Sequence, residues 1–378
     1  MKRNKVLNFI ATLALTLLCI FCIITLSSNN RKSFIEEQRV SIGLTTAQSE
    51  QLSKQQKGYY YSTLSDEDKL VYVDVLFSIS NLLTNVPIGN INEVQLQRIV
   101  DCVLADHPEI YYFNNYEYVI YNQDDYNILY FSPVYNYSAN EIEHINKSID
   151  NYVRDCFRDI SMSDDSYSIV KHIYEYVVLN TDYVLDSKNN QYITSVMLEG
   201  ESVCNGYAKA FQYLCYEADI PCIFVKGIIR EDATMHAWNI VQLQGQYYHV
   251  DCTWGDTNYD EYRNSYENIS YDYLCVPDSD ILKTHIVSNK FTLPVCDSMS
   301  CNYYIKEHLY LDTFNYAHYC SLLESAVDIL TVRCKDNDVL EEYTTYLFDK
   351  ENIFNSLNTT DVYYRINDIN NTFTVYLN

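Results

Sequence analysis

Apolar positions recur at helical and at extended spacing along the chain, which predicts a mixed α+β protein. Ser65-Asp66-Glu67-Asp68 offers a capped, acidic first turn, and apolar residues follow at helical steps from Leu70 to Leu83. A second helical pattern runs from about residue 91 to 106. A strand pair with a turn at residues 122–125 then follows between residues 110 and 131. These elements predict a small α+β unit.

The middle of the chain continues the mixed pattern. Capped helices are predicted from Ser138 to about Cys156 and from about residue 166 to 179. After Cys204, apolar residues recur at steps of three and four, so Cys204 lies at or just before a helix N-terminus. There the helix dipole and free backbone amides stabilise a thiolate and can hold an oxyanion. Cys222 to Ile229 is rich in β-formers and predicts a strand.

Two further β-rich runs, His236 to Leu243 and Gln246 to Trp254, are separated by Gln244-Gly245. If those two residues form the turn, Trp238 pairs with Asp251 and His236 pairs with Thr253. Asp251 then lies diagonally beside His236 on the same face, with Cβ atoms roughly 7 Å apart, within reach of a hydrogen bond. A three-residue turn would place Asp251 on the opposite face. The register therefore decides whether these two side chains can meet.

The rest of the chain predicts a tyrosine-rich polar loop to about residue 270, a short strand at 271–276, and a last α+β unit. That unit has helices at residues 322–332 and 343–355 and closing strands at 362–364 and 373–376. The predicted organisation has five parts: residues 1–30 a transmembrane signal anchor, 31–56 a linker, 57–138 the N-terminal unit, 139–285 a catalytic core, and 286–378 the C-terminal unit.

The first residues predict a membrane anchor. Lys2, Arg3 and Lys5 precede an apolar run from Val6 to Leu26, which as a helix is roughly 30 Å long and can cross a bilayer. Thr25-Leu26-Ser27-Ser28 is a poor cleavage site, which favours an uncleaved single-pass anchor over a signal peptide. The basic end then stays in the cytoplasm and the rest is extracellular. The alternative is a buried helix of a soluble protein.

Composition narrows the possible partners. The chain has 378 residues, is 48% hydrophobic and contains 39 tyrosines, which is enough to bury a substantial core. Its net charge of −25 excludes nucleic acid as a partner of the folded part. Two of its 13 cysteines, Cys19 and Cys22, lie in the apolar run. The others show no zinc-type C-x-x-C spacing, and their disulfide pairing stays open. The tyrosines predict a half-exposed sheet face, with a carbohydrate-binding face as the alternative.

The chemistry concentrates between Gly200 and Gly255. Five of the eight glycines and both tryptophans fall in this window, around a cysteine, a histidine and an aspartate in that order. We predict a triad in which Cys204 is the nucleophile, His236 the proton shuttle, and Asp251 the group that orients the imidazole. Such a triad attacks an amide or acyl carbonyl and forms a thioester.

Other interpretations of these residues stay open. His249 shares the face of His236, and His172 projects from the helix at 166–179. A metal site of His236, Asp251 and Cys252 is disfavoured because adjacent residues of a strand point to opposite faces. Asp256, Asp260 and Glu261 could bind calcium, although their spacing is not that of an EF-hand loop and a solvated acidic loop is the simpler interpretation. We expect no metal and no cofactor.

Three blocks of sequence resemble the transglutaminase-like superfamily over about residues 165–256. They are Gly200-Glu201-Ser202-Val203-Cys204-Asn205-Gly206-Tyr207-Ala208, His236-Ala237-Trp238-Asn239, and Tyr248-His249-Val250-Asp251-Cys252-Thr253-Trp254. The resemblance implies a papain-like α+β core whose cysteine starts a helix packed on an antiparallel sheet. It implies the triad roles for Cys204, His236 and Asp251, which decides against His249. The flanking units resemble extra domains of exported bacterial members more loosely.

The resemblance implies an enzyme, and its members include peptidases and acyl transferases. We expect a cell-surface cysteine enzyme that hydrolyses peptide or amide bonds, with protein cross-linking by acyl transfer as the first alternative. A non-catalytic surface-binding protein is the second alternative, and burial or disulfide bonding of Cys204 would favour it. A peptide or protein, including cell-wall peptides, is the expected substrate, and its identity is not readable from the sequence.

Overall fold

The chain divides into two compact units, residues 1–143 and 144–378. The computed structural model describes residues 36–88, 91–123, 126–161, 164–257, 269–357 and 359–377. Across these ranges, no helix combines the length and the apolar character needed to cross a bilayer. The predicted anchor at residues 1–30 lies outside the described residues. The finer division at residues 138 and 285 stays a prediction.

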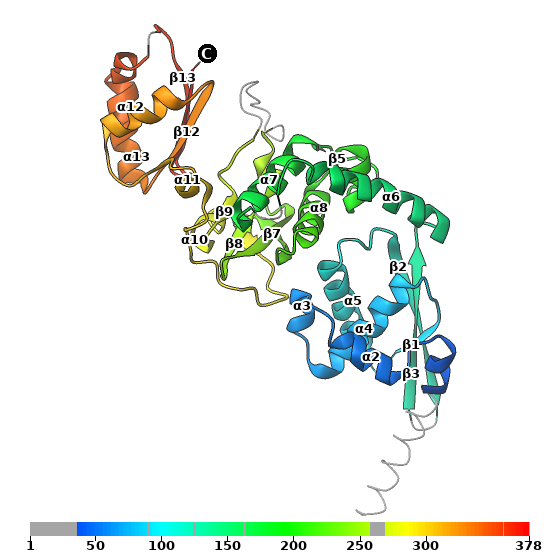
Figure 1. The fold of residues 1–378 in the computed structure, drawn as a ribbon. Helices are drawn as coiled ribbons and strands as arrows, with labels where there is room; N and C mark the ends of the chain where they lie inside the picture. The colour runs from blue at the N-terminus through cyan, green and yellow to red at the C-terminus, as the bar shows by residue number, and fades with distance from the viewer. Residues whose placement is uncertain are drawn as a thin grey trace, which may run out of the picture. The chain divides into compact units, whose positions relative to one another are not determined.

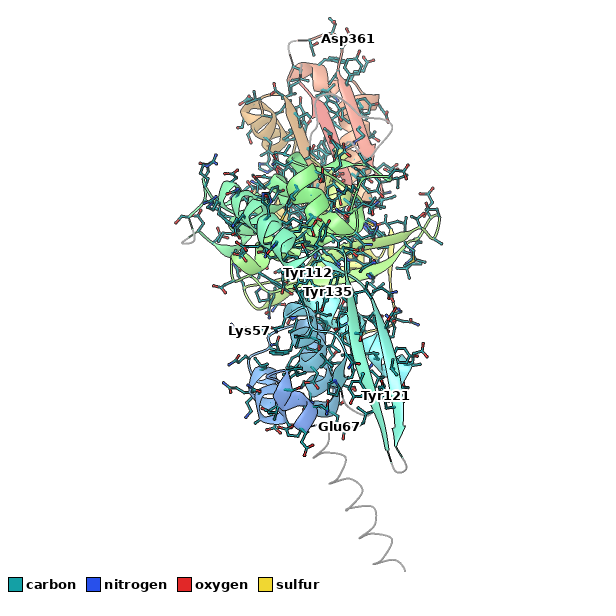
Figure 2. All side chains as sticks on the ribbon, turned by 90° about the vertical axis from the view of Figure 1, so that its right-hand side faces the viewer. Lys57, Glu67, Tyr112, Tyr121, Tyr135 and Asp361 are labelled. Atoms are coloured by element: carbon teal, nitrogen blue, oxygen red, sulfur yellow. The ribbon has the colours of Figure 1, made fainter. Side chains whose placement is uncertain are left out.

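The first unit packs helices against a small antiparallel sheet (Figure 1). Its helices are α2 (Thr46–Ser53), α3 (Tyr59–Ser62), α4 (Asp66–Ser80) and α5 (Glu93–Asp106), and its strands are β1 (Val86–Ile88), β2 (Phe113–Gln123) and β3 (Tyr126–Tyr135), in the order β1-β3-β2. The side chain of Ser65 caps α4, as predicted. In Figure 2, Tyr112 and Tyr135 lie near one end of the β2–β3 hairpin and Tyr121 lies toward the other.

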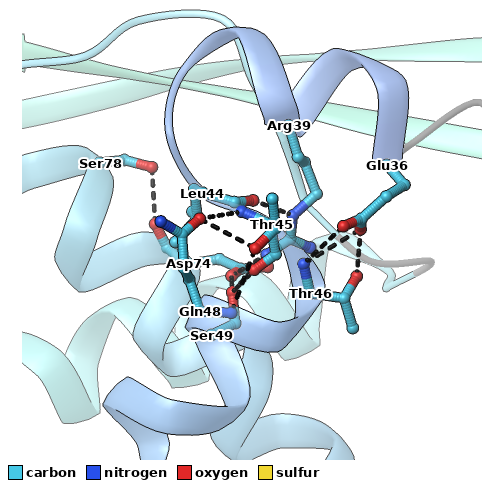
Figure 3. Close-up of polar contacts among 9 residues, drawn as sticks. All are labelled: Glu36, Arg39, Leu44, Thr45, Thr46, Gln48, Ser49, Asp74 and Ser78. Carbon is cyan, nitrogen blue, oxygen red and sulfur yellow. Dashed lines mark hydrogen bonds and ion pairs between the residues drawn. The ribbon is translucent and has the colours of Figure 1, made fainter.

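Part of the expected linker is ordered structure. Residues 46–53 form α2, and the buried guanidinium of Arg39 donates to the Leu44 carbonyl oxygen at 2.8 Å and the Ser49 hydroxyl at 2.6 Å (Figure 3). It also pairs with the buried carboxylate of Asp74 on α4. Burial raises the pKa of Asp74, and the positive charge of Arg39 acts in the opposite direction. A buried ion pair therefore fastens the segment around α2 to the first unit, where the sequence predicted only a tether.

The second unit contains the predicted helix-on-sheet core. Helices α7 (Ser166–Leu179) and α8 (Cys204–Glu217) pack on each other, and α8 packs on strands β6 (Cys222–Ile229) and β7 (Met235–Leu243) (Figure 1). With β8 (Gln246–Val250), β9 (Leu274–Val276) and β10 (His285–Val287), these strands form a five-stranded antiparallel sheet in the order β10-β6-β7-β8-β9. Around the core lie α6 (Ala139–Cys156), β4 (Asp182–Tyr183), η1 (Ser195–Glu199), β5 (Glu201–Ser202), α9 (Cys252–Gly255) and α10 (Asp278–Ile281).

The predicted register of the hairpin is confirmed. Asn239 pairs with Val250 and Leu243 with Gln246, which leaves Gln244-Gly245 as the two-residue turn. Both turn residues have positive φ, 52° and 79°, as a type I′ turn requires. The predicted strand end at Trp254 is wrong, because β8 ends at Val250 and Cys252–Gly255 forms the short helix α9.

The C-terminal part contains helices α11 (Tyr303–Lys306), α12 (Tyr316–Ser325) and α13 (Asn337–Thr344), with η3 (Thr345–Asp349) and η4 (Asn352–Asn355). Its sheet has the order β11-β12-β14-β13, from β11 (Tyr310–Leu311), β12 (Ile329–Cys334), β13 (Tyr363–Asn367) and β14 (Thr372–Tyr376). The two closing strands are confirmed. The helix predicted over 322–332 is wrong, because α12 ends at Ser325 and residues 329–334 form a strand with alternating burial.

Candidate active site

Cys204 is the first residue of α8, as predicted. The preceding Val203 provides no side-chain cap for this helix, and its backbone oxygen accepts from the amides of Gly206 at 2.9 Å and Tyr207 at 3.2 Å. Gly206 lets the first turn pack closely, because a Cβ atom there would lie 1.9 Å from the hydroxyl oxygen of Ser202. The positive φ of Gly200, 69°, turns the chain just before this start. The helix N-terminus therefore presents a cysteine sulfur at the positive end of the helix dipole.

His236 and Asp251 form a hydrogen-bonded pair. His236 stands near the start of β7, and its Nε2 donates to Oδ2 of Asp251 at 2.6 Å. Asp251 follows the last residue of β8, so the confirmed register brings the two residues together from neighbouring strands. His236 is 7% exposed and Asp251 is 0% exposed. Water therefore does not screen this pair.

The Asp251 carboxylate is held by four donors. Its Oδ1 accepts from the backbone amides of Thr253 at 2.9 Å and Trp254 at 3.1 Å, which makes Asp251 the N-cap of α9. Its Oδ2 accepts from His236 and also from Nε2 of His285 at 3.1 Å. Burial acts to raise the pKa of Asp251, but the charges and hydrogen bonds of the two histidines outweigh it and hold the pKa well below its ordinary value. The carboxylate is therefore a fixed anion.

The charge on Asp251 sets the protonation of His236. Burial acts to lower the pKa of His236, whereas Asp251 and Cys204 raise it, and the net effect is a pKa of about 10. The Cys204 thiol thus lies close enough to His236 to raise its pKa. Since Nε2 is committed to Asp251, the nitrogen left for Cys204 is Nδ1. The three residues that the sequence singled out thus lie together, with a hydrogen bond between His236 and Asp251.

His285 is the residue of this cluster that the sequence did not indicate. It starts β10, on the far side of β6 from β7, and its side chain is fully buried. Its ring centroid lies 4.6 Å from that of Trp254 and 5.1 Å from that of His236. No sequence signal points to it, because it lies outside every resembling block and reaches Asp251 only through tertiary packing.

His249 is a buried histidine whose ring nitrogens are both hydrogen-bonded. Its Nδ1 accepts from the indole Nε1 of Trp238 at 3.0 Å, and its Nε2 donates to Asp278 at 2.8 Å. Burial lowers its pKa. These partners make His249 a structural link, which agrees with its exclusion from the predicted triad.

Two groups of described side chains have metal-ligating atoms within 4.8 Å of one another: His236, Asp251 and His285, and His249, Asp278 and Cys296. Cys252 belongs to neither group. In the first, both imidazole N–H groups donate to the same carboxylate oxygen, so the group is satisfied without an ion. In the second, the indole of Trp238 donates to His249 Nδ1, so a neutral ring must carry its proton on Nε2, where a metal would bind.

The remaining sequence candidates have structural partners or lie outside the description. His172 Nε2 contacts the backbone oxygen of Cys156 at 2.7 Å. Asp256 accepts from the Tyr207 hydroxyl at 2.8 Å. Asp260 and Glu261 of the suggested calcium loop lie outside the described residues. All eleven cysteines of the described part are free thiols.

A buried indole N–H adds a donor near the site. Nε1 of Trp254 finds no hydrogen-bond partner among the described atoms. The Trp254 ring centroid lies 6.1 Å from that of His236. A buried donor without an acceptor is unusual, and this one is available to a group bound beside the histidine.

Residues 154–252 match the family model of the transglutaminase-like superfamily. The kyphoscoliosis peptidases of Mus musculus and Homo sapiens are each 32% identical to this chain over 72 residues, which are 16% of this chain and 11% of the relative. The chain thus spans about a tenth of the length of these curated relatives.

Two solved structures show weaker likenesses. A crystal structure of a TGase is 15% identical with a TM-score of 0.28, over 39% of this chain and 47% of that one. The structure of a candidate cysteine protease from Cytophaga hutchinsonii is 15% identical with a TM-score of 0.26, over 37% of this chain and 65% of that one.

Proposed function

We propose that this protein is a cysteine enzyme that acts on peptide or amide bonds through Cys204, His236 and Asp251. The chain belongs to the transglutaminase-like superfamily through residues 154–252. The observation that carries the proposal is a helix-start cysteine close to a histidine that is hydrogen-bonded to a buried aspartate. Each of the three residues matches one role of a thiol triad: nucleophile, proton carrier and orienting carboxylate.

The contacts support a defined sequence of steps. The Cys204 sulfur attacks the carbonyl carbon while His236 holds the proton, and the first-turn amides of α8 stabilise the oxyanion. His236 then gives the proton to the leaving amine as the carbon–nitrogen bond breaks, which leaves a thioester on Cys204. A water molecule, giving its proton to His236, attacks the thioester and frees the acid and the thiol. Asp251 stays ionised and keeps Nε2 of the imidazole protonated throughout.

Hydrolysis is our first choice and acyl transfer to an amine is the alternative. The sequence shows no dedicated amine pocket, and water needs none. We further propose that the apolar run at residues 6–26 anchors the protein in the cell membrane, with the catalytic part outside. The substrate class is then a peptide or protein at the cell surface, including cell-wall peptides.

The non-catalytic alternative gains support from one observation. Cys204 is only 8% exposed, and burial of this residue was the outcome expected of a scaffold cysteine. Against it, Cys204 begins helix α8 and lies close to the hydrogen-bonded pair of His236 and Asp251. Reactivity therefore separates the two functions better than exposure does.

The test compares two thiols within one molecule. The full-length protein in detergent is treated with a low concentration of a small alkylating probe, and each cysteine is quantified by peptide mass spectrometry. We expect Cys204 to react faster than Cys320, which is more exposed but has no histidine partner among its described contacts. His236→Ala should remove the difference, because the sulfur then loses its proton acceptor.

The outcomes separate the candidate functions. A Cys204 that reacts no faster than Cys320 in the wild type would refute the enzyme and favour the binding protein. For an active thiol, peptide substrates are offered with and without a primary amine in excess. Release of the free acid supports hydrolysis, and an amine-linked product supports acyl transfer. Cys204→Ala is the control for both products.

A further inference from the structure

We propose that His285 is a positioning residue of this site, which holds Asp251 and, through it, His236 in the orientation that the thiol chemistry needs. The proposal rests on the proposed function of the triad. It adds a fourth residue that lies outside both the family-model match and the predicted catalytic blocks.

The two oxygens of Asp251 are held by different elements. Backbone amides of α9 fix Oδ1, the cap position, whereas Oδ2 faces the two histidines. With His236 alone, Oδ2 could follow the imidazole wherever the ring moved. His285 binds the same oxygen from β10 and thereby ties it to a third element of the fold. Its hydrogen bond also occupies a lone pair that would otherwise be buried without a donor.

His285 is itself held in one orientation. Its Nε2 is committed to Asp251, and its Nδ1 contacts the hydroxyl of Thr284 at 2.8 Å. The ring packs against two indoles, with centroid distances of 4.6 Å to Trp254 and 5.0 Å to Trp238. A ring that uses both nitrogens and packs between large aromatic groups cannot turn without breaking several contacts. It can therefore serve as a fixed reference for the carboxylate.

The strand that carries His285 is placed by close backbone packing. His285 pairs with Ile229 of β6, and two residues further on Val287 pairs with Gly227. A Cβ atom at Gly227 would lie 2.2 Å from the backbone oxygen of Ile286, so only glycine allows β10 this close to β6. The short β10 therefore has a defined position relative to the catalytic strand β7, which also pairs with β6.

The C-terminal part also contacts the segment that precedes His285. The buried guanidinium of Arg333 on β12 pairs with Asp280 of α10, five residues before His285. Lys283 donates to the backbone oxygen of Ile369 at 2.8 Å. The position of His285 thus depends on residues that the catalytic motif does not include. This dependence gives the C-terminal part a role in the site although it lacks catalytic residues of its own.

The experiment compares His285→Phe with His285→Gln in the full-length protein. Phenylalanine keeps the aromatic packing and removes both nitrogens, whereas glutamine keeps an N–H donor near the position of Nε2. We expect Phe to slow alkylation of Cys204 on the order of 10–100-fold, the effect of misplacing a reacting group by a fraction of an ångström to an ångström. Glutamine should restore most of the rate. Melting temperature and circular dichroism check that each variant is folded.

A second readout does not depend on catalysis. The Nε2 proton of His236, shared with a buried carboxylate, should give a low-field proton resonance in NMR spectra. We expect His285→Phe to shift or broaden this resonance and His285→Gln to retain it. A purely structural histidine would lower the melting temperature without this pattern of loss and rescue.

The outcomes are distinguishable. A folded His285→Phe protein with the wild-type rate and resonance would overturn the inference and leave the proposed function intact. If wild-type Cys204 reacts no faster than Cys320, the proposed function fails, and the resonance alone then decides whether His285 orients His236. If Phe does not fold, Thr284→Val replaces it, because this change keeps the imidazole and removes the partner of Nδ1. The same slower rate and shifted resonance are expected, and wild-type behaviour would refute the inference.

Discussion

Replacing Asp251 with asparagine tests the site most directly, because it keeps the side-chain shape and removes the charge. The amide oxygen can still accept from the backbone amides of Thr253 and Trp254 and so keep the cap of α9. The amide nitrogen then faces the N–H groups of His236 and His285, which are both donors. To avoid this clash, the His236 proton must move to Nδ1, the nitrogen that should accept from Cys204.

The contacts set the size of the effect. Two hydrogen bonds to a buried carboxylate are lost, and removing one partner of a buried charged pair costs about 3–5 kcal/mol of stability. The wrong tautomer of the histidine costs a comparable triad a factor on the order of 10⁴ in rate. The raised pKa of His236, about 10, should also fall, because burial alone lowers it. We therefore expect a less stable protein whose Cys204 has lost its reactivity advantage over Cys320.

Asp278→Asn is the matched control. Asp278 also accepts a hydrogen bond from a buried histidine, His249 at 2.8 Å, yet it lies outside the triad. Both tryptophans lie in the second unit, so tryptophan fluorescence during urea denaturation reports the stability of that unit alone. Asp278→Asn should lower stability and leave the alkylation rate of Cys204 unchanged. A folded Asp251→Asn protein that alkylates Cys204 at the wild-type rate would refute the assignment of Asp251.

Three further predictions follow from single contacts. Because the pKa of His236 is raised from 6.5 to about 10, its contribution to stability is complete below about pH 6.5 and is lost as the pH rises through about 10. The free energy of unfolding, followed by tryptophan fluorescence, should therefore fall by up to about 5 kcal/mol across this range in the wild type, and by less in His236→Gln. Gly227→Ala should cost about 1–3 kcal/mol, because its Cβ would lie 2.2 Å from the Ile286 oxygen. Arg39→Met should destabilise the first unit by about 3–5 kcal/mol by leaving Asp74 buried and unpaired, measured by hydrogen exchange in α4.

Each of these predictions has its own control. Gly245 lies in open space at a turn that accepts asparagine. Gly245→Asn should therefore lower the free energy of unfolding much less than Gly227→Ala does in the same urea assay. The double change Arg39→Met with Asp74→Leu should recover much of the lost exchange protection, since no unpaired charge remains. A flat pH profile of wild-type stability between pH 6.5 and 10 would contradict the assigned charge state of His236.

The catalytic strand pair could be predicted because its register depends on local chemistry. A two-residue Gln-Gly turn fixes the pairing of every residue on both strands, and the period of two then fixes the faces. The start of α8 was predictable for a similar reason, since apolar spacing marks a helix and the glycines mark the loop before it. Short-range rules are enough where the deciding contacts lie close along the chain.

The wrong predictions also have physical causes. Asp251-Cys252-Thr253-Trp254 is rich in β-formers, yet the carboxylate accepts amides two and three residues ahead, which is the signature of an N-cap. Leu322 to Val332 contains enough apolar residues for a helix, but Thr331 and Val332 pair with strand β14. Arg39 looked like a linker residue because its partner, Asp74, lies on another helix. His285 was missed because its partner, Asp251, lies 34 residues earlier in the chain, at the end of another strand.

The small differences in exposure within the site agree with thiol chemistry, although the reactivity of Cys204 is the measurement that decides between the two functions. Asp251 and His285 are 0% exposed, whereas His236 and Cys204 keep 7% and 8%. In a triad only the nucleophile and the proton carrier must meet the substrate, while the orienting groups work best in a medium of low dielectric constant. His236 and Cys204, which retain some exposure, are the two residues that would touch a substrate. Asp251 and His285, which are fully buried, are the two that would hold His236 in place. A scaffold cysteine would need neither the buried anion nor its second histidine.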